Sequence, residues 1–198
     1  MPDILMFCED SFHERFLTAL LKRVGRECGV HPDLKVASGR GGLPKLAGEF
    51  KDFMRDATRP GLTPLLQILV VADANCLGYH DRRAAFATVV RNFYPSLEQY
   101  VEYAIPDPHI ERWMLLDPGA FKTVFGRGCT LPKLKCDKDE YKRILRHEIR
   151  QSGLEPLLGG EEFAGDIVSR MNLSKAEIHE PSFGLCLKAI RSQLRLGK

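Results

Sequence analysis

Two acidic residues stand where two apolar runs of the sequence end. Glu9 follows residues 4–8, and Asp73 follows residues 65–72. If both runs form neighbouring parallel strands, the two carboxylates meet at one edge of the sheet, where open α/β folds place their ligands. Mg²⁺ is held through one or two carboxylates, keeps several waters and is completed by phosphate oxygens. We therefore predict that Glu9 and Asp73 bind a divalent metal ion; the alternatives are that Glu9 is only a polar residue at a strand end and that Asp73 caps a helix or turn.

Other polar residues could complete this site. Asn75 lies two residues beyond Asp73 and offers a neutral amide oxygen as a further metal ligand. A second metal ion about 4 Å from the first would need more acids, and Asp10, Asp81 and Glu111 are the candidates. Glu111 is either a second-metal ligand or base, or a first-turn glutamate that the helix dipole favours.

Two histidines are predicted to lie near the same edge. His13 and His109 each fall in the first turn of an expected helix. A lone histidine there is predicted to be a surface or capping residue, with general acid–base chemistry as the alternative. Ser11 and Glu14 have the spacing of a capping box, which assigns the Glu14 carboxylate to the start of the helix.

The elements that must position these residues alternate between strand and helix. Apolar runs and helical periodicity predict strands at 3–8, 34–37, 65–72 and 100–105, and helices at 11–25, 43–57, 82–93 and from 109. From residue 130 onward only helices are predicted, at 138–151 with an Asp137/Glu140 cap pair, at 160–171 and at 182–196. The sequence thus predicts a Rossmann-like α/β domain, a mainly parallel sheet flanked by helices, over residues 1–126. A C-terminal helical extension, residues 127–198, is expected to pack on it.

Basic residues form a local cluster in the second half of the chain. The net charge of +3 does not by itself indicate a nucleic-acid partner. On the helix predicted at 138–151, however, Lys142, Arg143 and Arg146 lie on the outer face. They could position a phosphate backbone without reading its sequence, or form an ordinary solvated face. Arg40, in the glycine-rich turn at 39–42, could also touch nucleic acid, although a connecting loop is the simpler interpretation.

Composition bounds the class of protein. The chain has 198 residues, of which 44% are hydrophobic, enough for a substantial core. No run approaches 18 uninterrupted apolar residues, and no basic segment followed by an apolar core begins the chain, so we expect a soluble cytoplasmic protein with no membrane partner. In a reducing cytoplasm the six cysteines should be free thiols. Cys129 and Cys136 could hold zinc, but no second pair nearby completes four ligands.

Three segments carry a resemblance to a known family. Residues 7–17 resemble the first motif of Toprim domains, in which a strand ends in a glutamate with a helix just beyond. Residues 70–75 resemble the second motif, a strand that ends in Asp-x-Asp, with Asn75 at the second acidic position. Residues 104–117 are similar to the Ile-Pro…Ile-Glu-x-Trp-Leu-Leu signature of a little-characterised bacterial Toprim-like family. The resemblance covers residues 3–125.

This resemblance implies a fold and an activity. Toprim domains are related to topoisomerase–primase domains and to nucleases of the overcoming-lysogenization-defect type, which use Mg²⁺, or Mn²⁺, for phosphodiester chemistry. Glu9 and Asp73 would be metal ligands and catalytic residues, Asn75 a further ligand, and Glu111 a third catalytic residue. The substrate would be DNA or RNA, and the protein would be the effector of an anti-phage defence system that includes an ATPase encoded nearby.

A second hypothesis belongs to a different class of function. Asn75 replaces an acid and adds no charge, and Asp10 stands where these domains often have glycine. Both departures favour a catalytically inactive Toprim-like subunit that binds a partner ATPase or nucleic acid. The coexistence of Glu9, Asp73 and Glu111 favours the nuclease. The sequence predicts no oligomeric state, and fold analogy alone does not choose between the two hypotheses.

Overall fold

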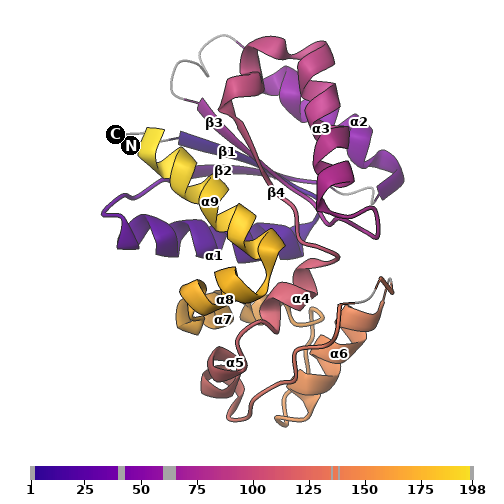
Figure 1. The fold of residues 1–198 in the computed structure, drawn as a ribbon, viewed down its shortest axis with the longest axis vertical. Helices are drawn as coiled ribbons and strands as arrows, with labels where there is room; N and C mark the ends of the chain where they lie inside the picture. The colour runs from indigo at the N-terminus through magenta and orange to yellow at the C-terminus, as the bar shows by residue number, and fades with distance from the viewer. Residues whose placement is uncertain (1–2, 40–42, 60–65, 135, 138, 197–198) are drawn as a thin grey trace.

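A four-stranded parallel sheet lies at the centre of the protein (Figure 1). This computed structural model describes residues 3–39, 43–59, 66–134, 136–137 and 139–196. The strand order is β2-β1-β3-β4, and every neighbouring pair is parallel. The strands are β1 (Asp3–Cys8), β2 (Asp33–Ser38), β3 (Leu66–Val71) and β4 (Val101–Ala104). The predicted α/β class, Rossmann-like with helices flanking a parallel sheet, is confirmed.

Helices cover both faces of the sheet, which explains why β1 and β3 are apolar except for Asp3 and Gln67. Alternate β1 side chains enter two different cores: Ile4 and Met6 in one, Leu5 and Phe7 in the other. The first face carries α1 (Ser11–Glu27) and α9 (Pro181–Leu196), and the second carries α2 (Leu43–Ala57) and α3 (Tyr79–Phe93) (Figure 1). A 3₁₀-helix, η1 (Pro95–Tyr100), leads into β4.

The remaining helices gather beyond α1 (Figure 1). They are α4 (Ile110–Met114), α5 (Pro118–Phe125), α6 (Glu140–Arg150), the 3₁₀-helix η2 (Glu161–Phe163), α7 (Ala164–Arg170) and α8 (Leu173–His179). α7 packs against α1, and α9 packs against β4. Parts of the segment after residue 126 therefore lie against the sheet and against α1.

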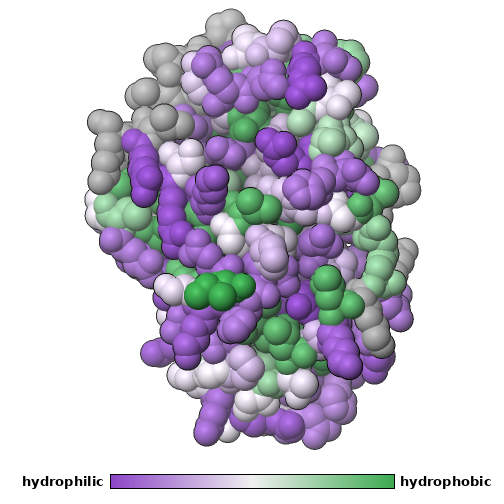
Figure 2. Space-filling view, in the orientation of Figure 1, coloured by the Kyte–Doolittle hydropathy of each residue, from purple (hydrophilic) through white to green (hydrophobic). Residues whose placement is uncertain are grey.

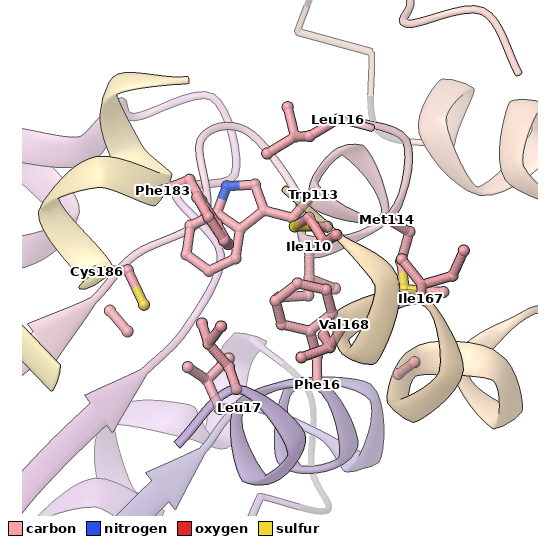
Figure 3. Packing of buried hydrophobic residues seen from close by; sticks show 14 of the residues in the cluster. Phe16, Leu17, Ile110, Trp113, Met114, Leu116, Ile167, Val168, Phe183 and Cys186 are labelled. Atoms are coloured by element: carbon pink, nitrogen blue, oxygen red, sulfur yellow. The ribbon is translucent and has the colours of Figure 1, made fainter. Parts of the chain in front are cut away.

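Trp113 joins distant parts of the chain in the larger core (Figure 3). Its ring centroid lies 5.8 Å from that of Phe16 on α1 and 5.2 Å from that of Phe183 on α9. The indole Nε1–H donates to Ser182 Oγ at 3.1 Å, so burial leaves no unpaired donor. Trp113 is completely buried, so it is a core residue and offers no exposed platform for stacking a base.

The predicted start of the first helix is confirmed, but its predicted capping box is wrong. α1 begins at Ser11, but its N-cap is Asp10, whose side chain accepts hydrogen bonds from the first-turn N–H groups. The Glu14 carboxylate instead accepts a hydrogen bond from Ser38 Oγ on β2, at 2.6 Å. The predicted capping box requires Ser11 to be the N-cap residue. Asp10, one residue earlier, has the extended backbone of an N-cap residue and occupies that position instead.

The helices between residues 140 and 179 also differ from the prediction. α6 begins at Glu140 and its N-cap residue, Asp139, makes no side-chain capping hydrogen bond, so the Asp137/Glu140 cap pair is wrong. The single helix predicted at 160–171 is the turn η2 followed by α7, and α8 comes directly after it. Asn172 separates α7 from α8, because its side chain accepts from Lys175 N–H and starts a new helix.

One pair of cysteines is bonded. Cys76 and Cys136 form a disulfide with their Cα atoms 5.3 Å apart, so the expectation of six free thiols is wrong. The same bond removes Cys136 from the zinc site considered with Cys129. Cys8, Cys28, Cys129 and Cys186 are free.

The molecular face in Figure 2 is mostly hydrophilic, with hydrophobic residues in small separate patches. The exposed large apolar side chains include Leu157, at 85% exposure, and Ile178, at 77% exposure. Within the described residues, none of the helices combines the length and the apolar character that a membrane crossing requires.

Candidate functional site

The two acids predicted at strand ends lie together. β1 and β3 are paired with Cys8 opposite Val71, so Glu9 and Asp73 leave the sheet at the same edge. Glu9 Oε2 accepts a hydrogen bond from the Asp73 backbone N–H at 2.9 Å. The predicted proximity of the two residues is thus confirmed. It follows from parallel pairing, because the carboxyl ends of adjacent parallel strands share one edge.

Asp73 is the centre of a buried hydrogen-bond network. Its Oδ1 accepts from the backbone N–H of Ile110 at 2.8 Å and lies 3.0 Å from His13 Nε2, while its Oδ2 lies 3.0 Å from His109 Nδ1. The first turn of α1 supplies His13, and the N-cap of α4 supplies His109. A carboxylate at the N-terminus of a helix is stabilised by its unpaired N–H groups, which is the position Asp73 occupies relative to α4.

His13 connects two carboxylates. Its ring nitrogens contact Asp10 Oδ1 at 2.7 Å and Asp73 Oδ1 at 3.0 Å, and the residue is completely buried. Burial alone would lower the pKa of His13, but the Asp73 charge and the hydrogen bonds to Asp10 and Asp73 outweigh it and raise this pKa well above the ordinary range. Burial likewise opposes ionisation of Asp73, yet the His13 charge and the bonds from both histidines hold the Asp73 pKa below its usual value. The pair is therefore a buried imidazolium and carboxylate.

Glu111 behaves in the opposite way. It is buried on α4, and burial together with the nearby Asp73 charge raises its pKa to about 7, although Lys142 opposes this. Lys142 Nζ lies 3.8 Å from Glu111 Oε1. Burial, the largest effect, also raises the pKa of Glu9. Carboxyl groups with pKa values pushed apart in one cluster are typical of sites that perform acid–base or metal chemistry.

The arrangement forms two overlapping groups of potential metal ligands. Glu9, His13 and Asp73 make one, and Asp73, His109 and Glu111 make the other. Within each group, one ligand atom per residue lies within 4.8 Å of the others. Asp73 belongs to both, so it could bridge two positions or orient the ligands of one.

Three other candidates are distributed differently. Asn75 has a positive φ of 47°, and its side-chain Nδ2 donates to the Asp73 backbone oxygen at 3.3 Å, so its role as a metal ligand stays a prediction. Asp81 is exposed at the start of α3 and is in neither ligand group. Arg40 lies outside the described residues. Gly39, just before it, approaches the site closely: a Cβ there would lie 2.8 Å from the Glu9 backbone oxygen.

α6 presents a basic face next to this cluster. Tyr141, Leu145 and Ile149 are buried, while Lys142, Arg143 and Arg146 are exposed. Lys142 and Arg146 line a cavity of about 160 Å³ between the starts of α1 and α6. Its wall also includes Asp10, Ser11, Glu111 and Glu161. Arg143 lies on the same outer face but does not line the cavity.

The two histidines are the residues that the sequence interpretation undervalued. Both His13 and His109 are buried at the centre of the network, whereas the sequence favours surface or capping positions for them. A signal existed in their position, since the first turn of a helix that follows a strand must lie near the same sheet edge. The sequence does not indicate that both histidines contact Asp73, because Asp73 is 36 residues from His109 and 60 residues from His13.

The fold and site together define an open parallel α/β protein with a carboxylate–histidine cluster at the carboxyl edge of its central strands. Comparison of the chain with models of protein families, with curated proteins and with solved structures finds no match. The resemblance to Toprim domains therefore rests on the three motifs of the sequence.

Proposed function

We propose that this protein is a metal-dependent phosphodiester hydrolase that acts on nucleic acid. The observation that carries the proposal is that Asp73, at the carboxyl edge of β1 and β3, joins two overlapping groups of potential ligands, one containing Glu9 and the other Glu111. Asp73 and Glu111 are buried and Glu9 is half-buried, and acids in such an arrangement are unfavourable unless positive charge balances them. The Toprim-like motifs point to the same residues and imply nuclease chemistry in an anti-phage system.

The donor set fits a divalent cation. Glu9 and Asp73 would hold Mg²⁺ or Mn²⁺, with Asn75 and Glu111 completing the site. One carboxylate oxygen is available as a ligand, because Glu111 Oε2 is buried with no hydrogen-bond partner among the described residues. When bound, such an ion polarises the phosphate and activates the attacking water. In the metal-free protein the pKa of Glu111 is about 7, and the positive charge of a bound ion would favour its ionised, ligating form.

The basic face of α6 would hold the substrate. Lys142 and Arg146 line the cavity that opens beside Glu111, so a phosphate group there would meet two positive charges, and a bound metal ion would offset the acids Asp10, Glu111 and Glu161 in the same wall. Arg143 extends this charge along the outer face of the helix. Interactions of this kind bind DNA or RNA through the backbone and carry no sequence information.

The test is cleavage of DNA and RNA substrates with Mg²⁺ or Mn²⁺. We expect Glu9→Gln and Asp73→Asn to abolish cleavage, with retained nucleic-acid binding, and circular dichroism should verify that both variants fold. Asp81→Asn is the matched control, because Asp81 is an exposed acid in neither ligand group and should leave cleavage unchanged. Cleavage that survives Glu9→Gln and Asp73→Asn would contradict the proposal.

One observation favours the alternative, an inactive subunit that binds a partner ATPase or nucleic acid. The buried His13 imidazolium already balances the Asp73 charge from within the protein, so Asp73 does not need a metal ion for this. A wild-type protein that cleaves nothing, alone or with an ATPase encoded nearby, would support this alternative. Pull-down of that ATPase by wild type would then identify the partner.

A further inference from the structure

Two buried polar atoms in the cluster have no hydrogen-bond partner among the described residues: His109 Nε2 and Glu111 Oε2. Both residues are more than nine-tenths buried, at 4% and 3% exposure. Buried polar atoms nearly always have a partner, and exceptions call for an explanation such as an ion. Both atoms belong to residues of the same ligand group, which Asp73 completes.

The second polar atom of each side chain already has a partner. His109 Nδ1 lies 3.0 Å from Asp73 Oδ2, and because a carboxylate only accepts, the ring donates its Nδ1–H. In the neutral imidazole this leaves the Nε2 lone pair free. Glu111 Oε1 is 3.8 Å from Lys142 Nζ, which leaves Oε2. Histidines that bind metal nearly always donate their second N–H to a carboxylate in this way.

His13 provides a contrast within the same cluster. Both of its ring nitrogens are engaged, one by Asp10 and one by Asp73. It could bind an ion only by giving up one of these hydrogen bonds. His109 is therefore the histidine that is arranged as a ligand, and His13 is the one arranged as an internal cation.

We propose that His109 Nε2 and Glu111 Oε2 bind a divalent transition-metal ion, with Asp73 orienting the His109 ring. An imidazole ligand suits Zn²⁺, Co²⁺ or Mn²⁺ better than Mg²⁺, which prefers oxygen alone. The inference deepens the proposed function and rests on it in one respect, that the ion would serve the same hydrolysis. The metal binding itself is measured without any substrate.

Pulsed electron paramagnetic resonance with Mn²⁺ provides the direct test, because it detects nitrogen bound to the ion. We expect a nitrogen coupling in the wild-type protein and its loss in His109→Gln. His80→Gln is the matched control, since His80 is an exposed histidine on α3 outside both ligand groups, and it should keep the coupling. Absence of nitrogen coupling in the wild type, or a coupling that survives in His109→Gln, would overturn the proposal.

Calorimetric titration with Zn²⁺ supplies the second measurement. His109→Gln and Glu111→Gln should each weaken Zn²⁺ binding by at least about tenfold, since even residues that only support metal ligands contribute this much. The Mg²⁺ affinity should change little in His109→Gln, because Mg²⁺ gains little from nitrogen. Equal Zn²⁺ affinity in wild type and His109→Gln would overturn the inference. If His109→Gln does not fold, the wild-type nitrogen signal and the Glu111→Gln titration still decide.

The outcomes separate this inference from the proposed function. Nitrogen coupling and tight Zn²⁺ binding in a protein that cleaves no nucleic acid would leave the metal site in place and remove the hydrolase. Mg²⁺-dependent cleavage by a protein without nitrogen coupling would do the reverse.

Discussion

At the scale of single residues, the charge on His13 governs the site. Held between Asp10 and Asp73, it allows two carboxylates to stay ionised where burial alone would favour their neutral forms. The pKa of Asp10 falls to about 2, with hydrogen bonds and charge from His13 outweighing burial. Such an internal cation balances part of the negative charge of the cluster, so a metal ion is attracted less strongly than the number of acids suggests.

The raised pKa of His13 predicts how stability depends on pH in the metal-free protein. A histidine whose folded-state pKa exceeds its ordinary value of 6.5 contributes stability below that pH and loses it as pH rises through the folded-state pKa. Glu111 adds to the trend between 4.5 and about 7, because the folded state keeps its proton longer than the unfolded chain does. The unfolding free energy should therefore fall from pH 5 toward alkaline pH.

Urea denaturation in the presence of a chelator, repeated across this pH range, measures the effect. His13→Gln should be less stable at pH 5 and show a flatter pH dependence, whereas His80→Gln, at an exposed position, should follow the wild type. Nuclear magnetic resonance should find the His13 ring still protonated at pH 7. A neutral His13 at that pH would contradict the description of the buried ion pair.

The second prediction at this scale concerns Asn75. Replacing the amide by a carboxylate adds a full negative charge, and hard cations prefer anionic oxygen, so Asn75→Asp should bind Mg²⁺ more tightly than wild type. The positive φ of 47° is tolerated by both residues, which makes the substitution compatible with the backbone. Calorimetric titration gives the affinities. Equal or weaker binding in the variant would mean that Asn75 serves the loop and does not face the metal.

At the scale of elements, the sequence predicts best where one strong local pattern decides the structure. The apolar runs place β1 and β3, and the periodicity of residues 43–57 matches α2 residue for residue. It fails where tertiary contacts decide. α7 and α8 have seven residues each, too short to be stable alone, so packing against α1 and α9 defines them. For the same reason Glu9 and Asp73 were predictable, and the burial of His13 was not.

The third prediction belongs to α6. Reversing the charges of Lys142, Arg143 and Arg146 should weaken nucleic-acid binding and flatten its dependence on salt. Each phosphate that the variant no longer neutralises keeps its counterions, so the slope of log K against log salt should shrink by about one per phosphate. Fluorescence anisotropy at several salt concentrations gives both quantities.

A control with the same change in net charge distinguishes a binding face from general electrostatics. α2 covers the face of the sheet opposite to α1 and α9 (Figure 1). Reversing the charges of exposed basic residues on α2, or just after it, should weaken nucleic-acid binding less. Suitable positions are Lys51, Arg55 and Arg59. Equal reductions of affinity in both variants would indicate that net charge, and not the α6 face, determines the affinity.

At the scale of the whole molecule, the two predicted parts of the chain share one core. The larger apolar cluster includes Phe16 and Trp113 from the first part and Ile167 and Phe183 from the second (Figure 3). The buried ion pair between Arg112 and Glu180, 2.8 Å apart, crosses the same boundary. Because the extension covers one face of the sheet, the position of α4, and with it His109 and Glu111, depends on helices that follow residue 126.

The disulfide makes a further connection across this boundary. Cys76 follows Asn75 in the loop after β3, and Cys136 precedes α6, so the bond joins the loop beside the carboxylate–histidine cluster to the segment leading to the basic helix. Protein purified without reductant and then denatured should expose four thiols, and six after reduction. Closing a loop over a separation of 60 residues predicts that reduction costs about 2–4 kcal/mol of unfolding free energy.

Thiol titration and urea denaturation, each with and without reductant, check this last prediction. Cys76→Ser should reproduce the stability of the reduced protein and respond no further to reductant. Cys28→Ser, which removes an exposed free thiol, should keep the wild-type stability and lose one thiol both before and after reduction. Six thiols in the unreduced protein would contradict the bond. Because the bond fixes the loop that carries Asn75, its reduction should also weaken metal binding. The metal affinity of Cys28→Ser should respond to reductant in the same way as that of the wild type.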